Sequence, residues 1–221
     1  MFVILVSNPI FNKEGLFLNN IYNSIANKLT SFFTRKRTIS NDDKEMYTYG
    51  FEVLISSVVY TLIFILVSAI TNTVLPSLCF FIGFYLIRSS SGGFHANTYT
   101  LCHILYFINH IVFIIIIKTF PNIAINLFAG GFFIVSGMLV LAFAPVDHPN
   151  KPFINNEETR FRKRSILCGI ALIAISIVAF NLSNMIVLKY LFSTSIGSLS
   201  ASISLAIARI QKERRIKHEK V

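Results

Sequence analysis

Six apolar stretches, separated by short polar segments, occupy most of the chain after residue 51. They cover residues 53–70, 74–87, 98–117, 122–144, 165–188 and 190–208, and none contains Lys, Arg, Asp or Glu. A helix needs about 20 mostly apolar residues to cross a bilayer. The pattern therefore predicts an all-α, multi-pass integral membrane protein. We expect about six transmembrane helices between residues 51 and 208, within a single membrane-embedded domain that comprises residues 1–221.

Two features of this pattern leave alternatives open. The second stretch is short and contains Pro76, so a four-span arrangement, in which this stretch and its neighbour are re-entrant, also fits the sequence. The last two stretches are separated either at residues 181–184 or at Lys189. The last stretch is rich in serine and holds two small residues four apart, Gly197 and Ala201, which favour close packing between helices.

Apolar residues recur with helical spacing ahead of the first stretch. They are Leu18, Ile21, Ile25, Leu29 and Phe32. Asparagines and Lys28 occupy the opposite face. This spacing predicts an amphipathic helix over residues 15–34, which either lies on the inner leaflet of the membrane or packs on the protein itself.

Composition supports the membrane assignment. Of the 221 residues, 54% are hydrophobic and 14% are charged, whereas about 25% of residues are charged in a soluble domain. The net charge of +10 would favour nucleic acid in a soluble protein, but the sequence carries no nucleic-acid-binding motif. In a membrane protein such a charge is typical of basic cytoplasmic loops that contact anionic lipid. Three cysteines are too few for a disulfide framework, and we expect no cleaved signal peptide.

The distribution of Lys and Arg predicts an orientation. With six spans and a cytoplasmic N-terminus, 18 of the 20 basic residues fall in cytoplasmic segments, and only Lys118 and Lys189 fall outside. Cytoplasmic loops of membrane proteins are enriched in Lys and Arg. We therefore expect both termini on the cytoplasmic face, together with the segment after the second stretch and a basic tail at residues 209–221.

The polar segment between the second and third stretches, RSSSGGFHANTYTLC at residues 88–102, contains a candidate catalytic pair. Cysteine is a nucleophile as a thiolate, which a nearby His or a positive field favours. His95 and Cys102 are seven residues apart, about 10 Å along a straight helix, so a catalytic pair requires the chain to bend between them. Gly92 and Gly93 allow unusual backbone angles just before His95, and a helix that begins near Cys102 would favour its thiolate. The alternative is a buried cysteine beside a loop histidine.

Other polar residues are weaker candidates. Cys79 and Cys168 lie inside apolar stretches and are expected to pack as small hydrophobic residues. His103 and His110 are either functional intramembrane residues or hydrogen-bonded packing residues. Cys102, His103 and His110 have poor spacing for a zinc site, and we expect no metal and no cofactor.

Two acidic residues have open roles. Glu52, in YGFE, is either a helix-start acid or a partner for a basic residue of the site. Asp147 belongs to APVDHPNKP at residues 144–152, a rigid cytoplasmic turn. This turn either binds substrate, or orients His95 through Asp147, or only ends the fourth span. Glu52 and Asp147 are both candidates for an acid that orients the catalytic pair, and a site without a third group is the alternative. Arg88 is either a positive-inside anchor or a group that stabilises an oxyanion or binds substrate carboxylates.

The segment RSSSGGFHANTYTLC resembles the signature of the accessory gene regulator B family, with its Arg, its glycines, His-Ala, and a Cys seven residues after the His. YGFE before the first span and APVDHPNKP after the fourth are similar to further recurrent segments of that family, in the same order. The resemblance extends from about residue 49 to the end of the fifth span.

This resemblance implies a cysteine endopeptidase in the plasma membrane of Gram-positive bacteria, with its active site at the cytoplasmic face. The substrate would be an AgrD-like propeptide for quorum sensing, with an amphipathic leader, a central Cys or Ser, and an acidic tail. Cys102 would be the nucleophile and His95 the base. Candidates for oxyanion stabilisation or substrate binding are Arg88, Gly92, Gly93 and Lys151. Some members carry several basic residues where this sequence has only Lys151.

The implied reaction removes the tail through an acyl-thioester on Cys102 and closes a thiolactone or lactone ring. Two other functions also fit the sequence: a small-molecule transporter, and a non-catalytic membrane signalling partner such as a scaffold for a histidine kinase. Transport would explain six helices and an intramembrane His110, but not the glycine–histidine–cysteine segment. The small-residue spans are also compatible with a homodimer.

Overall fold

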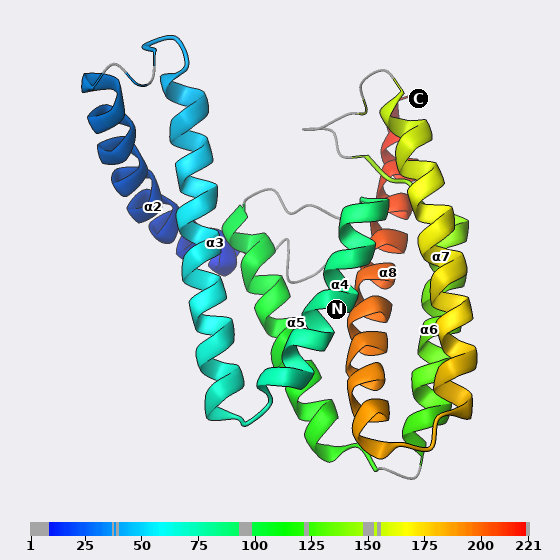
Figure 1. The fold of residues 1–221 in the computed structure, drawn as a ribbon. Helices are drawn as coiled ribbons and strands as arrows, with labels where there is room; N and C mark the ends of the chain where they lie inside the picture. The colour runs from blue at the N-terminus through cyan, green and yellow to red at the C-terminus, as the bar shows by residue number, and fades with distance from the viewer. Residues whose placement is uncertain are drawn as a thin grey trace. The chain divides into compact units, whose positions relative to one another are not determined.

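The computed structural model describes residues 9–36, 38, 40–92, 99–121, 124–147, 153 and 156–219. Within these ranges the chain forms seven helices and no strand (Figure 1). They are α2 (Pro9–Arg35), α3 (Lys44–Ile70), α4 (Val74–Ser91), α5 (Tyr99–Thr119), α6 (Ile125–Phe143), α7 (Glu157–Asn181) and α8 (Met185–Glu219). The predicted all-α fold is confirmed.

Six helices of the described part, α3 to α8, are long and apolar enough to cross a membrane. Each corresponds to one of the six predicted stretches, although α3, α7 and α8 begin earlier than predicted and α7 ends before residue 188. The last two are separated at residues 182–184, because α7 ends at Asn181 and α8 begins at Met185. Asn184 explains this boundary: its Oδ1 accepts hydrogen bonds from the backbone N–H groups of Ile186 (3.0 Å) and Val187 (3.2 Å). Such a side-chain cap satisfies donors that an α-helix leaves unpaired at its start.

The chain divides into two compact units, and the division falls inside α3 and α5. The first unit comprises Met1–Val67 and His95–Ile108, and the second comprises Ser68–Phe94 and Asn109–Val221. Each unit is described by itself below.

In the first unit, α2 packs on α3 through small and polar side chains. Tyr22, Ala26 and Thr30 of α2 are buried, and Thr48 of α3 donates a hydrogen bond to the Thr30 hydroxyl (3.1 Å). The apolar residues that define the predicted amphipathic face are on a neighbouring face of α2. Ile21, Ile25, Leu29 and Phe32 are all exposed. The helix therefore packs on the protein, as one of the two predicted arrangements has it, but through the face that carries Tyr22, Ala26 and Thr30. The apolar face that the spacing marks does not make this contact.

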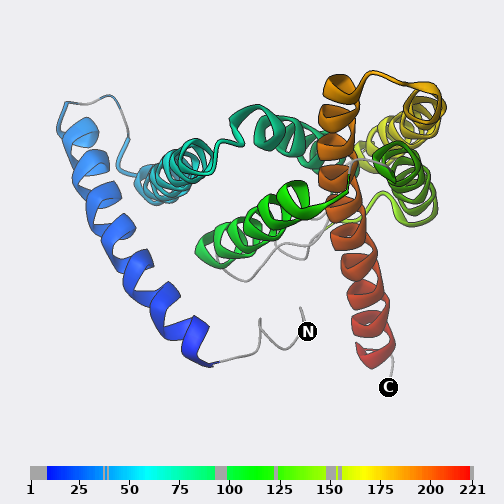
Figure 2. The same cartoon turned by 90° about the horizontal axis from the view of Figure 1, so that it is seen from below.

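In the second unit, α8 lies between α4 on one side and the α6–α7 pair on the other (Figures 1 and 2). The packing is close because small residues face neighbouring backbones. A Cβ on Gly197 of α8 would lie 2.0 Å from the carbonyl oxygen of Phe80, and a Cβ on Gly83 of α4 would lie 2.2 Å from that of Thr194. Ala201 is 3% exposed. The predicted close packing at Gly197 and Ala201 is confirmed.

The serines of α8 fit an apolar environment because their hydroxyl groups donate hydrogen bonds to backbone carbonyls. Ser193 donates to the carbonyl of Lys189 (2.8 Å) and Ser202 to that of Ser198 (2.9 Å), each one turn earlier in the helix. Ser202 also lies 3.3 Å from the carbonyl oxygen of Ser136 in α6. Such hydrogen bonds satisfy hydroxyl groups that would otherwise be costly to bury in lipid or in a helix interface.

Candidate functional site

Cys102 lies in the first turn of α5, which begins at Tyr99, four residues after His95. Its thiol is half-buried and forms no disulfide. The first N–H groups of a helix lack intrahelical acceptors and create a partial positive charge, which favours an anion such as a thiolate. The prediction that a helix begins near Cys102 is confirmed. His95 and Gly93 lie outside the described residues, so their pairing with Cys102 stays a prediction.

Three polar residues share one face of α3, and two of them contact the start of α5 within the first unit. The three are Glu52, Ser56 and Tyr60, spaced four residues apart and hence one turn apart on one face. The Tyr60 ring stacks on the ring of His103, with centroids 4.6 Å apart, and Ser56 Oγ lies 3.4 Å from His103 Nε2. These contacts hold the residue next to Cys102 in a fixed orientation. His103 is thus a hydrogen-bonded, stacked side chain, which agrees with the packing alternative.

Glu52 is 9% exposed and accepts a hydrogen bond from the side-chain amide of Asn23 in α2. Because α3 begins at Lys44, Glu52 is not a helix-start acid. It is a buried carboxylate in the same unit as Cys102. Its role as an orienting acid stays a prediction.

Sequence reasoning missed Asn23, Ser56 and Tyr60. The four-residue spacing of Glu52, Ser56 and Tyr60 was visible as a polar row in an otherwise apolar span. The contact of Asn23 had no comparable signal, because it joins residues 29 apart in the sequence.

Gly92 ends α4 in the second unit and has a backbone conformation that side chains disfavour, with φ 76° and ψ −147°. It forms a parallel bridge with Val146, and a Cβ on Gly92 would lie 2.2 Å from the Val146 carbonyl oxygen. Gly92 thus adopts the kind of backbone angles that only glycine takes readily, as expected. The bend between His95 and Cys102 involves residues outside the described ranges and stays a prediction. Arg88 lies in the last turn of α4 and is half-buried; its role in substrate or oxyanion binding stays a prediction, as does that of Gly92.

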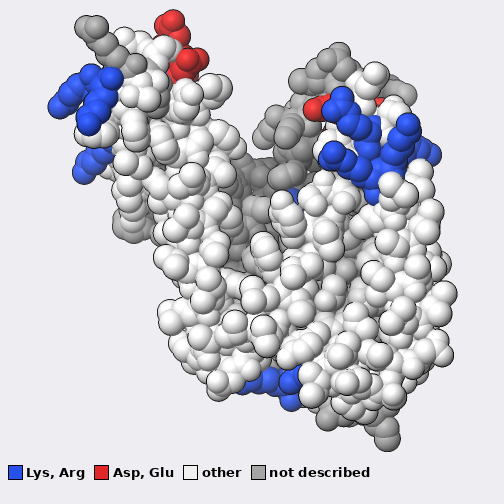
Figure 3. Space-filling view, viewed as in Figure 1, with Lys and Arg blue, Asp and Glu red and all other residues white. Residues whose placement is uncertain are grey.

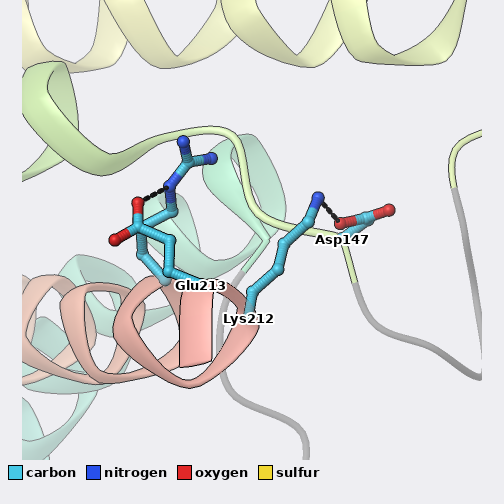
Figure 4. Close-up of polar contacts among 4 residues, drawn as sticks. Asp147, Lys212 and Glu213 are labelled. Atoms are coloured by element: carbon cyan, nitrogen blue, oxygen red, sulfur yellow. Dashed lines mark hydrogen bonds and ion pairs between the residues drawn. The ribbon is translucent and has the colours of Figure 1, made fainter. Parts of the chain in front are cut away.

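Asp147 forms an ion pair with Lys212 of α8, with Oδ1 and Nζ 2.5 Å apart (Figure 4). Sequence reasoning had placed Lys212 only among the basic residues of the tail. Asp147 belongs to the second unit and His95 to the first, and a direct contact between them stays a prediction. Lys151 lies outside the described residues.

His110 has the surroundings of a packing residue. It is fully buried in the second unit, with its Nε2 3.0 Å from Ser77 Oγ and 3.3 Å from Ser68 Oγ. The rings of Phe80 and Phe113 flank it. Cys79 and Cys168 are half-buried and free of disulfides. In the described ranges, no group of three or more His, Cys, Asp or Glu side chains is arranged to hold a metal ion.

Comparison with known proteins identifies the family. The family model described as Accessory gene regulator B matches residues 23–207. Two proteins of Clostridium perfringens with AgrB-like names, from strain 13 / Type A and strain SM101 / Type A, are each 28% identical over 155 residues, which is 68% of this chain and 71% of theirs. No solved structure matches. The matched region contains α3 to α7 in full together with the segment that carries His95 and Cys102, and the chain belongs to the accessory gene regulator B family, which places it in the agr system of quorum sensing.

Proposed function

We propose that the protein is a membrane cysteine endopeptidase that removes the C-terminal tail of an AgrD-like propeptide and promotes cyclisation of the remaining peptide. The observation that carries this proposal is the position of Cys102 in the first turn of a membrane helix, directly after the segment that contains His95. Family membership supports a role in processing. The helix N-terminus supports a thiolate on Cys102, since its partial positive charge stabilises an anion there.

The first chemical step forms the acyl-enzyme. His95 takes the proton of the Cys102 thiol, and the Cys102 sulfur attacks the peptide carbonyl carbon that precedes the tail. Collapse of the tetrahedral intermediate breaks the C–N bond, and the leaving amine of the tail receives the proton from His95. The acyl part of the propeptide remains on Cys102 as a thioester. Arg88 and the backbone N–H groups near Gly92 and Gly93 are candidates to stabilise the oxyanion.

The second step closes the ring. The propeptide's own cysteine loses its proton to His95 and attacks the thioester carbonyl, and Cys102 departs as a thiolate. One thioester is exchanged for another, so the step is close to neutral in free energy. A serine in the same position would give a lactone by the same route. Exclusion of water from the acyl-enzyme prevents hydrolysis from competing, and a site at the membrane surface suits this need.

The basic residues of the chain support both the proposed substrate and the proposed orientation of the protein in the membrane. An AgrD-like propeptide would bring its amphipathic leader to the lipid and its acidic tail to the basic cytoplasmic face, where Lys151 is one candidate contact. We propose that both termini and the active site face the cytoplasm. A homodimer stays a prediction. The small residues Gly83 and Gly197 pack against neighbouring helices of the second unit, so they give a dimer no additional support.

The transport alternative gains no support from His110. A residue that conducts a solute or a proton needs access to an aqueous path, whereas His110 is fully buried between serine hydroxyls and aromatic rings. A transporter would also not depend on the Cys102 thiol.

The decisive experiment is intact-protein mass spectrometry on the purified full chain in lipid, mixed with an AgrD-like propeptide. We expect wild type to gain the mass of the propeptide without its tail, at Cys102. Cys102→Ala should lose the adduct and cleave at least about 10³-fold more slowly, because the nucleophile is gone. His95→Ala should lower the rate of adduct formation to a similar extent.

Cys79→Ala and Cys168→Ala are matched controls, because both residues are half-buried cysteines of other helices. Both variants should retain the adduct. If wild type leaves an authentic propeptide intact, or Cys102→Ala cleaves it as fast as wild type, the peptidase proposal fails and transport becomes the leading alternative.

A further inference from the structure

The C-terminal end of α4 is held by two segments that are distant in the sequence. Ser165 of α7 donates a hydrogen bond to the Ser90 carbonyl (3.1 Å), and the backbone N–H of Val146 donates to the Ser91 carbonyl (3.1 Å). The last four carbonyls of a helix lack intrahelical donors, so these bonds satisfy groups that the helix end leaves open. Ser91 and Val146 are both buried, at 0% and 3% exposure. The chain therefore leaves α4 from a fixed point.

The direction in which the chain leaves α4 is also fixed. Gly92 adopts a positive φ of 76° and lies so close to Val146 that a Cβ would approach the Val146 carbonyl oxygen to 2.2 Å. His95 follows three residues later in the sequence. The position of Val146 thus decides the backbone conformation from which the segment with the proposed catalytic base begins.

Val146 is itself held by its neighbours in the chain. The Ala144 N–H donates to the Val140 carbonyl at the end of α6 (3.0 Å). On the other side, Asp147 pairs with Lys212, which extends from α8 to the segment after α6 (Figure 4). The Asp147 side chain is 21% exposed and that of Lys212 is 38% exposed. Partial burial strengthens such a pair relative to one in open water.

We propose that Asp147 and Lys212 are positioning residues: their ion pair holds Val146 against the end of α4 and so fixes the start of the segment that carries His95. This inference rests on the proposed function for its catalytic consequence. Ser165, Val146, Asp147 and Lys212 are called the α4-end clamp below. Neither charged residue of the clamp needs to touch the substrate. The pair acts through the backbone, and an error of about 1 Å in placing a catalytic group costs about 10²-fold in rate.

The test measures the Cys102 thiolate directly and needs no propeptide. The full chain, with Cys79→Ala and Cys168→Ala so that Cys102 is its sole thiol, is placed in lipid and alkylated with iodoacetamide over a range of pH. Wild type should react fast at neutral pH, and His95→Ala should react slowly. Lys212→Met and Asp147→Asn should each react about tenfold more slowly at pH 7 than the parent, with profiles displaced to higher pH, because a misplaced His95 generates less thiolate.

Charge exchange separates the clamp from direct roles of either residue. The double variant Asp147→Lys with Lys212→Asp should recover to within about threefold of wild type, since the pair is restored with reversed signs. If Asp147 instead orients His95 directly, Lys212→Met will react like wild type and the exchange will not rescue. If Lys212 instead binds an acidic tail, Lys212→Met will raise KM for the propeptide and leave alkylation unchanged. Either result overturns the clamp.

Arg209 and Glu213 supply the matched control. Arg209 lies one turn before Lys212 and Glu213 directly follows it, and the two form an ion pair at 3.0 Å with exposed side chains (Figure 4). Among the described residues this pair joins α8 to no other segment. Arg209→Met and Glu213→Gln change the same kinds of charge. Both variants should keep the alkylation profile of wild type, and an equal loss of reactivity in them would overturn the proposal by showing a general effect of charge on α8.

A second readout does not depend on catalysis. The Val146 amide is the donor to the Ser91 carbonyl, so its hydrogen–deuterium exchange reports whether the clamp is closed. Exchange should become at least about tenfold faster in Lys212→Met and stay unchanged in Arg209→Met. If His95→Ala reacts with iodoacetamide like wild type while Val146 exchange responds as expected, the proposed function fails and the clamp survives as a structural device. If Val146 exchange does not respond to Lys212→Met, the clamp itself is wrong.

Discussion

At position 92, both the backbone conformation and the packing require a glycine. Its φ of 76° with ψ of −147° belongs to a region that only glycine occupies readily. Its neighbour Val146 leaves no room for a Cβ. A glycine in a polar segment often reflects flexibility alone, but here the residue lets two backbones form a bridge.

We therefore expect Gly92→Ala to lower the free energy of unfolding by at least about 1–3 kcal/mol, the range for a residue held in a disfavoured backbone region. The measurement is thermal or chemical unfolding of the full chain in lipid or mild detergent. Gly131→Ala in α6 is the control, because a Cβ there would meet no atom within 4 Å. Alanine favours a helix interior over glycine by up to about 1 kcal/mol, so this variant should be neutral or slightly more stable. Equal stability of Gly92→Ala and wild type would contradict the conformational argument.

At the scale of elements, α2 presents two separate faces within the first unit. Tyr22, Ala26 and Thr30 pack on α3, and an adjacent apolar stripe is exposed. The stripe consists of Ile21, Ile25, Leu29 and Phe32. The ammonium of Lys36 lies 4.8 Å from the centroid of the Phe32 ring. Apolar residues flanked by basic ones are typical of a helix that lies in the interface of an anionic bilayer.

We predict that this stripe contacts lipid. The chain contains no tryptophan, so a single introduced Trp reports its own surroundings. Phe32→Trp in vesicles that contain brominated lipid should be quenched several-fold more strongly than Asn27→Trp, since Asn27 is exposed on the opposite, polar face of α2. Equal quenching at the two positions would show that the stripe does not face the bilayer.

At the scale of the whole molecule, charge and hydrophobicity are distributed as a bilayer requires. Within the second unit, Lys and Arg side chains gather at the end where α7 begins and α8 finishes, and the surface between the ends is almost free of charge in this view (Figure 3). Lys118 in the last turn of α5 and Lys189 in the second turn of α8 belong to the opposite end. The larger basic group is expected on the cytoplasmic side.

Single-cysteine labelling in intact cells tests this orientation. In a background without the three native cysteines, Lys118→Cys and Lys189→Cys should react with a membrane-impermeant maleimide added outside, because the positive-inside rule places these positions on the outer face. Glu158→Cys and Glu213→Cys, which are also exposed, should react only after the membrane is permeabilised. If the two introduced cysteines at the glutamate positions are labelled in intact cells, the protein has the opposite orientation. The proposed active site would then not face the cytoplasm.

The sequence by itself determined the helices and their membrane character. Long uncharged stretches are a local property of the chain, and a bilayer core admits few backbone structures besides helices. Some helix ends could be predicted for the same reason. Asn184 lies within one of the two predicted breaks, and its side chain caps α8 by accepting hydrogen bonds from backbone N–H groups two and three residues later. The candidate site segment could also be recognised from the sequence, because the glycines, His95 and Cys102 are close together in it. The expected start of a helix near Cys102 is present in the structure.

Only the tertiary structure decided which distant residues act together. Asn23 with Glu52, Tyr60 with His103, and Asp147 with Lys212 join residues that are tens of positions apart, and no local pattern encodes such pairs. The two faces of α2 were likewise indistinguishable from periodicity alone, which marks an apolar side but not the partner that covers it. Local spacing fixes hydrogen bonds within a helix and the hydrophobic match to lipid. The choice of partners depends on how helices pack side by side. Small residues such as Gly83 and Gly197 permit close packing, but they do not specify which helix packs there.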